Sequence, residues 1–453
     1  MEYRNIPSVE AVINTDSLKE LSGEYPREWL VDITRLQISN NRIGIKEGHP
    51  VKNAEIISME VVDYVKNIMS VKPRDVINAS GVIIHTNLGR APLSEDSITS
   101  AMKCSEGYSD LEFDLESGKR GARLASVKSL LTQLTQAEDA VVVNNNAAAL
   151  LLALSALCTG KEVIVPRSEA IEIGGGFRIP DVLSQSGATL VDIGTTNRTY
   201  ISDYERAISD NTGAFLKAHS SNFVITGFTH EVSTKELSII GKKHGIPVMH
   251  DVGSGAFLDT SVYGLTHEPT PQESIADGAD LVFFSGDKLL GGPQSGIIIG
   301  KKAYISVLER HPMMRAIRMD KMNLAALSTT LGHYLKNEAL TKIPVWKMIS
   351  TTNSELMQRL QAIIQQCQTG VSIQESESAI GGGSLPGETI PTKVLSIDCS
   401  LLGVSAEKMQ SDFRKLRIPI VVRIENEKVI IDPRTISPAD DEYVKLALQS
   451  VLK

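Results

Sequence analysis

The chain has 453 residues, 42% of them hydrophobic and 22% charged, which is typical of a globular protein of about three domains. Its formal net charge of −8 argues against a broad, non-specific nucleic-acid binder, although one local patch could still bind a structured RNA. The longest apolar run, 147–158, is too short to span a bilayer, and the N-terminus lacks a signal-peptide core. We therefore expect a cytoplasmic protein without a membrane partner.

The four cysteines are scattered along the chain, at Cys104, Cys158, Cys367 and Cys399. None has CxxC spacing or a neighbouring histidine pair, so we expect neither a disulfide framework nor a metal site.

Residues 1–72 have the pattern of helices, with Asp16 and Asn53 as candidate N-caps and a loop over 44–52 between helices. Acidic and basic residues are nearly balanced in this region, so it is not a basic arm. We expect a small helical domain that ends at Lys72-Pro73.

Short β-branched runs alternate with amphipathic helices after residue 73. We expect strands over 139–143, 162–166, 189–193, 214–218 and 247–250, and helices over 174–186, 202–209 and 234–244. This alternation predicts an α/β domain over 73–335, with a mostly parallel sheet covered on both faces. Ligands of such sheets bind at the carboxyl ends of the strands.

Lys288 lies between the apolar run 279–284 and a glycine-rich loop that contains Gly291 and Gly292, before a strand over 295–299. A lysine at a buried strand end is poorly solvated, and burial lowers its pKa towards that of a Schiff-base lysine. Taken alone, this segment is better explained by a hydrated surface lysine on a hairpin than by a Schiff-base lysine.

Asn144, Asn145 and Asn146 join the strand over 139–143 to an alanine-rich helix that starts near Ala147. The first turn of a helix has unpaired N–H groups and a positive dipole end, which suits a phosphate. Plain helix capping is the alternative interpretation.

Asp251 ends the strand over 247–250 and precedes Lys288 by 37 residues. A buried carboxylate there could keep the ring nitrogen of pyridoxal phosphate protonated. A phosphate turn, an aspartate and a lysine in this order predict a pyridoxal-phosphate site. Neither GxGxxG after a first strand nor GxxxxGK[ST] occurs, so nucleotide-binding interpretations lack their motif.

Several arginines are candidates for binding an anion. Arg90 lies between a glycine turn and a proline, and Arg123 ends a second glycine loop. Arg315 and Arg318 are three residues apart and face one side of a helix or turn. A solvated surface cluster, with Asp320 as a local partner, is the alternative.

Residues 336–453 have the pattern of a smaller α/β domain. We expect a helix over 353–366, a glycine loop over 381–383, strands over 394–398, 418–422 and 429–431, and helices from Ala406 and Pro438. Arg423 follows the middle strand.

The chain resembles the bacterial L-seryl-tRNA(Sec) selenium transferases, fold type I pyridoxal-phosphate enzymes, nearly from end to end. The resemblance is carried by the motifs at 77–81, 85–92, 143–148, 172–175, 177–181, 191–198, 285–296 and 315–321. The chain departs from the family at Pro166-Arg167-Ser168-Glu169-Ala170-Ile171-Glu172, and at Ser80, where threonine is usual.

The resemblance implies a large domain with a seven-stranded sheet and conversion of L-seryl-tRNA(Sec) to L-selenocysteinyl-tRNA(Sec). Lys288 would hold pyridoxal 5′-phosphate and remove the Cα proton of the seryl ester. Loss of the β-hydroxyl would then give an aminoacrylyl-tRNA, to which selenide from selenophosphate adds at Cβ while the phosphate leaves. The other residues implied at the cofactor are Asp251, Asn144, Asn145, Asn146, Ala147 and Ser285. Arg90, Arg315 and Arg318 would bind selenophosphate, and Arg123 and Arg423 match arginines of the active-site region.

The resemblance also implies that residues 1–72 recognise tRNA shape and that the protein is a homo-oligomer, a decamer made of five dimers. Two alternatives stay open. A pyridoxal-phosphate lyase acting on a small phosphorylated amino compound would share Lys288 and Asp251, but would have no use for residues 1–72. An RNA-binding scaffold without catalysis would have no use for the lysine.

Overall fold

The computed structural model describes residues 5–70, 72–174, 176–220, 222–365 and 370–452. Cys367, named above, and Gly175, which belongs to the motif at 172–175, lie outside these ranges. The chain divides into two units, Met1–Asp75 and Val76–Lys453, which we describe separately. Within the described ranges, no helix combines the length and apolarity needed to cross a membrane.

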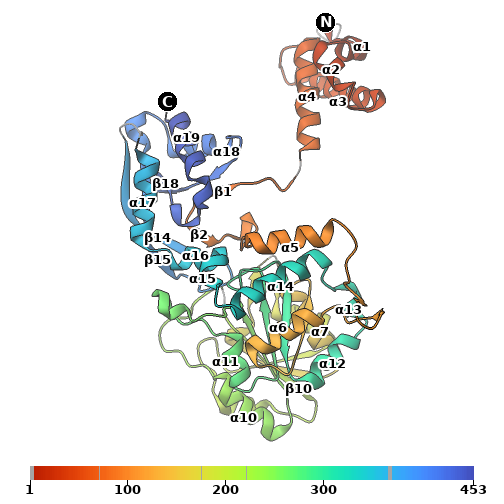
Figure 1. Cartoon of the computed structure of the whole chain (residues 1–453), viewed down its shortest axis with the longest axis vertical. Coiled ribbons are helices and arrows are strands. Elements are labelled where there is room, and N and C mark those ends of the chain that lie inside the picture. The colour runs from red at the N-terminus through yellow and green to blue at the C-terminus, as the bar shows by residue number, and fades with distance from the viewer. Residues whose placement is uncertain (1–4, 71, 175, 221, 366–369, 453) are drawn as a thin grey trace. The chain divides into compact units, whose positions relative to one another are not determined.

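The N-terminal unit is helical, as expected (Figure 1). It consists of α1 (Val9–Ile13), α2 (Asp16–Leu21), α3 (Arg27–Lys46) and α4 (Ala54–Met69). Asn53 caps α4, its side chain accepting a hydrogen bond from the Ile56 N–H at 2.8 Å, which confirms that prediction. The cap predicted at Asp16 is wrong, because Thr15 is the N-cap residue of α2.

A seven-stranded sheet forms the centre of the second unit. Its strand order is β5 (Asp139–Val143), β13 (Gly296–Gly300), β12 (Leu281–Ser285), β11 (Val248–Gly253), β10 (Thr212–Ala218), β6 (Glu162–Pro166) and β9 (Thr189–Ile193). Only β13 runs antiparallel to its neighbours in this sheet. The predicted mostly parallel sheet is therefore confirmed.

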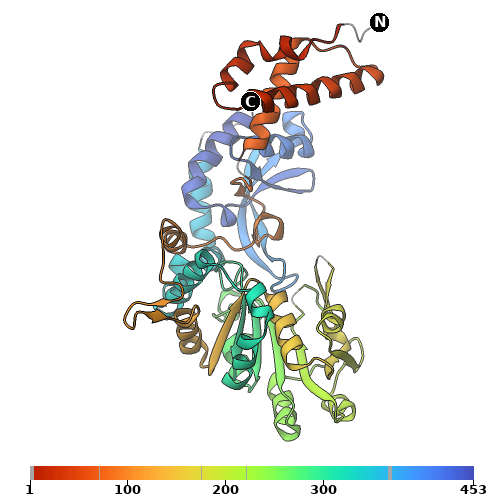
Figure 2. The ribbon, with the colours of Figure 1, turned by 90° about the vertical axis from the view of Figure 1, so that its right-hand side faces the viewer.

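Helices cover both faces of this sheet, as the two views in Figures 1 and 2 show. Buried side chains pack α6 (Ala125–Thr135) and α14 (Lys321–Leu335) against one face. On the other face they pack α7 (Asn146–Leu157), α8 (Ile179–Gln185) and α12 (Lys302–Arg310). Val282 and Phe284 join the first cluster while Leu281 and Phe283 join the second, because successive side chains of a strand point to opposite faces.

A second sheet has five strands, in the order β17 (Arg423–Glu425), β18 (Lys428–Ile431), β15 (Thr389–Asp398), β14 (Val371–Gly381) and β2 (Val82–Ile84). Beside it, β1 (Ile77–Asn78) pairs with β16 (Ile420–Val421). We assigned residues 73–84 to the catalytic core from the sequence, but their two strands pair with C-terminal strands. The helices of this region are α17 (Asn353–Ile364), α18 (Ala406–Arg414) and α19 (Asp441–Val451).

Two local predictions are wrong. The helix expected over 174–186 begins only at Ile179, because β7 (Glu172–Gly174) and β8 (Phe177–Arg178) form a hairpin before it. The loop expected over 44–52 starts later, since α3 continues through Gly44 to Lys46. The remaining helices and strands are α5 (Glu95–Ser105), β3 (Phe113–Asp114), β4 (Lys119–Arg120), α9 (Ile201–Ala207), α10 (Thr234–His244), α11 (Pro271–Ala276), α13 (Met313–Ala316), α15 (Ala339–Lys342) and α16 (Pro344–Ser350).

Candidate active site

The loop that carries Lys288 spans residues 286–295, between β12 and β13. The Gly286 N–H donates to the Ser295 carbonyl at 2.9 Å, and the Gly292 N–H donates to the Gly286 carbonyl at 2.8 Å. A Cβ atom on Gly286 would lie 2.0 Å from Ser295 Oγ, so only glycine fits there. The backbone of the lysine loop is therefore closely fixed.

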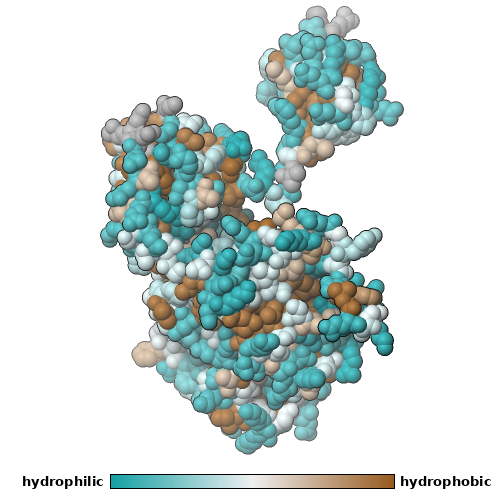
Figure 3. Space-filling view, in the orientation of Figure 1, coloured by the Kyte–Doolittle hydropathy of each residue, from teal (hydrophilic) through white to brown (hydrophobic). Residues whose placement is uncertain are grey.

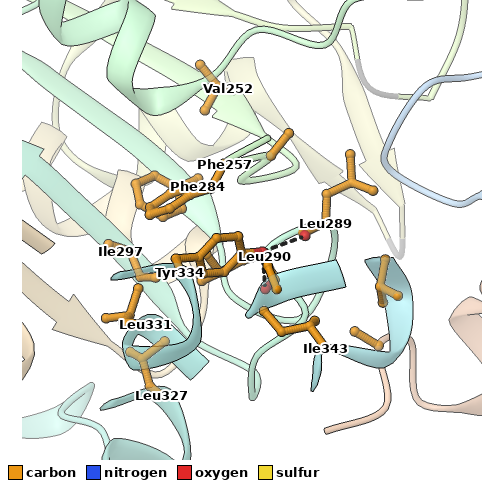
Figure 4. Close-up of a cluster of buried hydrophobic side chains, with 14 of the residues drawn as sticks. Val252, Phe257, Phe284, Leu289, Leu290, Ile297, Leu327, Leu331, Tyr334 and Ile343 are labelled. Atoms are coloured by element: carbon orange, nitrogen blue, oxygen red, sulfur yellow. Dashed lines mark hydrogen bonds between the residues drawn. The ribbon is translucent and has the colours of Figure 1, made fainter. Parts of the chain in front are cut away.

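The residues that follow Lys288 anchor the loop in the core (Figure 4). Leu289 and Leu290 are fully buried, and the Tyr334 hydroxyl donates to the Leu290 carbonyl at 2.8 Å. The Leu289 N–H donates to the Ser254 carbonyl at 3.0 Å. These contacts leave the preceding lysine little freedom to turn towards solvent.

Lys288 itself is 5% exposed, so the surface-lysine interpretation is wrong. Burial lowers the pKa of its amine from 10.5, the nearby Arg90 guanidinium lowers it further, and the Asp251 carboxylate opposes both. An amine in this environment loses its proton more readily than an ordinary lysine, which both a nucleophile and a general base require.

Asp251 lies on β11, on the same face as Met249, which packs in the cluster that contains α7. Its Oδ1 accepts hydrogen bonds from Asn146 Nδ2 at 2.9 Å and from the Gly253 N–H at 3.0 Å. Among the described residues, no hydrogen bond reaches its Oδ2. The side chain is buried, and burial raises the pKa of the carboxyl above 3.8.

The three asparagines have three different roles. Asn145 is the N-cap of α7 and accepts from the Ala148 N–H at 2.9 Å, so the capping interpretation holds for this residue. Asn146 donates to Asp251, and its buried Oδ1 has no hydrogen-bond partner within the described ranges of the chain. Asn144 is exposed, and its N–H donates to the Ile317 carbonyl at 2.9 Å. The first turn of α7, with Ala147 in it, still offers unpaired N–H groups.

Arg90 is bound to the residue next to the lysine. It has a left-handed backbone with φ of 65°, and its Nη1 donates to Asp287 Oδ2 at 2.9 Å. The Ala91 N–H also donates to the Asp287 carbonyl, at 3.2 Å. The structure thus brings Arg90 to the lysine loop.

Arg315 and Arg318 lie near the start of α7, because Val143 forms an isolated β-bridge with Arg318. Arg318 Nη1 is 3.7 Å from Glu112 Oε1. Arg315 is exposed, and no ion pair to it occurs in the part of the chain that the structure describes.

Arg123 contacts the same carboxylate as Arg318. Its Nη1 donates to Glu112 Oε1 at 3.0 Å and its Nη2 to the Met319 carbonyl at 2.7 Å. The hydrogen bond from Arg123 is the main cause that lowers the pKa of Glu112. Arg120 also donates to Glu112, at 2.7 Å, so three arginines share one acidic partner.

Arg423 forms hydrogen bonds in and beside the second sheet. Its guanidinium donates to the Ser80 carbonyl at 2.7 Å, to Ser376 Oγ at 2.8 Å and to the buried Asp432 at 3.2 Å. Its hydrogen-bonding capacity is largely used there, which favours a structural role over the active-site role that the resemblance implied.

We did not single out His219 and Glu268 from the sequence, but His219 contacts Asp251 and Glu268 contacts His219. The His219 N–H donates to the Asp251 carbonyl at 2.8 Å, and His219 Nε2 is 3.3 Å from Glu268 Oε2. Burial lowers the pKa of His219 and is the largest single cause, but the hydrogen bond and the charge of Glu268, together with the charge of Glu231, raise the pKa overall. His219 and Glu268 line a cavity of about 850 Å³. His219 directly follows β10, so the rule that ligands bind at strand ends could have found it.

The model of the L-seryl-tRNA selenium transferase (SelA) family matches residues 76–437. The chain is 45% identical to the L-seryl-tRNA(Sec) selenium transferase of Alkaliphilus oremlandii (strain OhILAs), over 100% of this chain and 99% of the relative. It is 44% identical to that of Clostridium botulinum (strain Okra / Type B1), over 99% of this chain and 98% of the relative. The solved structure of D-glucosaminate-6-phosphate ammonia-lyase shares the fold, with a TM-score of 0.61 and 20% identity over 86% of this chain and 98% of that chain.

Proposed function

Because the chain belongs to the L-seryl-tRNA selenium transferase family, we propose that it converts L-seryl-tRNA(Sec) to L-selenocysteinyl-tRNA(Sec). It is an α/β enzyme of fold type I that depends on pyridoxal 5′-phosphate. Full-length identity of 45% to a transferase carries this conclusion. The ammonia-lyase is similar at only 20% identity, which bears on the fold alone, so the lyase alternative gains no support.

Pyridoxal phosphate fits the residues at this edge of the sheet. The site has a buried amine at Lys288, a buried carboxylate at Asp251, and a buried Asn146 Oδ1; neither Asp251 Oδ2 nor Asn146 Oδ1 has a hydrogen-bond partner among the residues described. Lys288 would hold the aldehyde carbon, Asp251 the ring nitrogen, and the first turn of α7 the phosphate. When bound, the cofactor supplies an electron sink for the carbon that loses a proton.

Lys288 Nζ would then move the protons of the reaction. Burial lowers the pKa of this amine, so Nζ can take the proton from the seryl Cα, which the ester already acidifies. The same nitrogen can return a proton when the product forms. Asp251 would stay ionised beside a protonated ring nitrogen, because that opposite charge would offset the burial that otherwise raises its pKa.

Arg90, Arg315 and Arg318 would bind selenophosphate as the selenium donor. Clustered guanidiniums match the oxygens of a tetrahedral anion with paired hydrogen bonds. Arg315 is exposed, and Arg318 is 3.7 Å from its only described acidic partner, so both can turn to an incoming anion. Arg90 would either replace its hydrogen bond to Asp287 with one to the anion or hydrogen-bond both groups at once.

The helical N-terminal unit would recognise the shape of the tRNA, which fits its balanced charge. A homo-oligomer, a decamer by analogy with the family, is our proposal for the assembly. Tyr108, Phe113 and Leu115, on and beside the β3–β4 hairpin, have exposed apolar side chains, which favours a protein partner. Figure 3 also shows apolar groups on the surface near α13. We place the enzyme in the cytoplasm, where its tRNA substrate is made.

Purified protein, incubated with serylated tRNA(Sec) and selenophosphate, should yield selenocysteinyl-tRNA(Sec). An ordinary seryl-tRNA should give no product, since the shape of tRNA(Sec) is what the N-terminal unit would read. Absence of selenocysteine on tRNA(Sec), with the cofactor bound and the seryl ester intact, would refute the proposed function.

A further inference from the structure

Strands β14 and β15 are joined by a glycine-rich loop, 382–388, that lies against the Lys288 side chain. A Cβ atom on Gly381 would lie 2.4 Å from the Ile84 carbonyl oxygen. A Cβ atom on Gly383 would lie 2.7 Å from Lys288 Nζ and 2.8 Å from Lys288 Cε. A Cβ atom cannot lie this close to Nζ and Cε unless the lysine side chain shifts. The absence of a side chain at Gly383 therefore leaves room for the side chain of Lys288.

The next two residues carry signs of a ligand site. Ser384 is fully buried, and its hydroxyl finds no hydrogen-bond partner in the described part of the chain. Leu385 is buried and has a left-handed backbone with φ of 47°, a conformation that is unfavourable for a bulky residue. A buried hydroxyl left unpaired is also costly, so two unfavourable features directly follow Gly383 in the loop.

The loop is tied at both ends, which keeps these features next to the lysine. The Gly382 N–H donates to the Ile84 carbonyl at 3.2 Å. At the other end, the Glu388 carboxylate accepts from Thr266 Oγ1 at 2.6 Å and from the Thr266 N–H at 3.2 Å. Leu385 lines the same cavity as His219, so the loop approaches the lysine at Gly383 and lines that cavity at Leu385.

We propose that Ser384 Oγ hydrogen-bonds an oxygen of the amino-acyl ester that reacts at Lys288, and that Gly383 keeps the space in which the lysine amine works. The inference rests on the proposed function, because that function brings a seryl ester to the amine. Two of the oxygens near the reacting carbon are good hydrogen-bond acceptors, the carbonyl oxygen of the ester and the β-hydroxyl of the seryl side chain. A serine hydroxyl can donate to either of them.

The first test compares Ser384→Ala with Ser396→Ala. Ser396 is also buried and its hydroxyl also lacks a partner among the described residues, but it belongs to β15 and pairs with Ser372 and Ile430 within the second sheet. Both variants should take up pyridoxal phosphate and bind tRNA(Sec) like the wild type. The probes are tRNA(Sec) charged with alanine, whose binding changes the visible spectrum of the bound cofactor, and tRNA(Sec) charged with serine, whose dehydration is followed in a single turnover.

Ser384→Ala should weaken the response by about twofold to tenfold, the effect of one neutral hydrogen bond, while Ser396→Ala should not change it. A weakened response to both esters assigns the hydrogen bond to the carbonyl oxygen. A weakened response to the seryl ester alone assigns it to the β-hydroxyl. Unchanged responses of Ser384→Ala to both esters would overturn the proposal. Failure of the proposed function looks different, because the wild type itself would then respond to neither ester.

The second test compares Gly383→Ala with Gly387→Ala. Both glycines have a left-handed backbone, with φ of 83° and 77°, but a Cβ on Gly387 would meet nothing within 4 Å. The two substitutions therefore introduce similar backbone strain, but only Gly383→Ala places an atom against Lys288. Gly383→Ala should slow capture of pyridoxal phosphate at least tenfold, measured by borohydride fixation on the Lys288 peptide, at unchanged thermal stability relative to Gly387→Ala. Equal capture by the two variants would show that Gly383 does not position the lysine.

Discussion

Replacement of Asp251 by asparagine separates a cofactor role from a structural one. Asp251 Oδ1 already accepts both of its hydrogen bonds, from Asn146 Nδ2 and the Gly253 N–H, while Oδ2 is free of described partners. The amide oxygen of asparagine can keep both bonds, so Asp251→Asn changes mainly the group at the Oδ2 position. The variant should fold with its surroundings unchanged.

Asp251→Asn should not destabilise the cofactor-free protein, but it should lower the turnover of the enzyme with cofactor. Burial raises the pKa of Asp251 in the folded protein, so the cofactor-free protein loses stability as pH rises from 3.8 through that raised pKa. At neutral pH, cofactor-free Asp251→Asn should therefore be as stable as the wild type or more stable. With cofactor, loss of one partner of a buried charge pair costs about 3–5 kcal/mol, which lowers turnover roughly 100-fold to 5,000-fold.

The assays are thermal unfolding of the cofactor-free protein, spectroscopic titration with pyridoxal phosphate, and single-turnover dehydration of the seryl ester. Asp280→Asn is a matched control, since Asp280 is a buried carboxylate that accepts from the Val248 N–H at 2.7 Å and pairs with Lys301 at 2.6 Å. It should destabilise both forms alike. Equal destabilisation of the cofactor-free protein by the two variants, or turnover of Asp251→Asn within tenfold of the wild type, would refute this reasoning.

Three further predictions concern the amine, the anion site and the N-terminal unit. Lys288→Ala should be colourless and inactive but should bind tRNA(Sec), as filter binding can test; borohydride labelling of another lysine in the wild type would contradict the assignment. Arg315→Ala and Arg318→Ala should each slow selenium transfer about tenfold or more and dehydration much less; equal loss of both steps in single-turnover assays would mean that these arginines are structural. Deletion of residues 1–72 should leave the yellow colour and remove tRNA binding, and retained tRNA affinity would place recognition elsewhere.

The sheet was predictable because its strands are short β-branched runs that end sharply. The strands expected at 139–143, 162–166 and 189–193 agree with the observed bounds to the residue. The errors occur where tertiary contacts outweigh local preference. Gly44 costs a helix about 1 kcal/mol relative to alanine, yet α3 continues past it to bury Ile45. Strand β14 escaped prediction because its Ser-rich and Glu-rich sequence has few apolar residues.

The candidate site was predictable to the extent that it depends on strand ends. Asp251 lies near the carboxyl end of β11 and Lys288 lies in the loop that follows β12, and the shared sheet edge brings them together. Their partners are not visible in the sequence, because each arises from a contact between distant segments. Glu268 lies 49 residues beyond His219, and Asp287 lies 197 residues beyond Arg90. No spacing rule connects such pairs before the fold is known.

The arginines show how a cationic site is kept stable until an anion arrives. Neighbouring guanidiniums repel each other, and the sequence left open whether carboxylates or a bound anion would offset this repulsion. The structure supplies carboxylates: Asp287 binds Arg90, and Glu112 contacts both Arg123 and Arg318. One carboxylate shared among several guanidiniums leaves an excess of positive charge, which is the condition for attracting a multiply charged anion. The acidic partners therefore reduce the cost of the cluster without cancelling its charge.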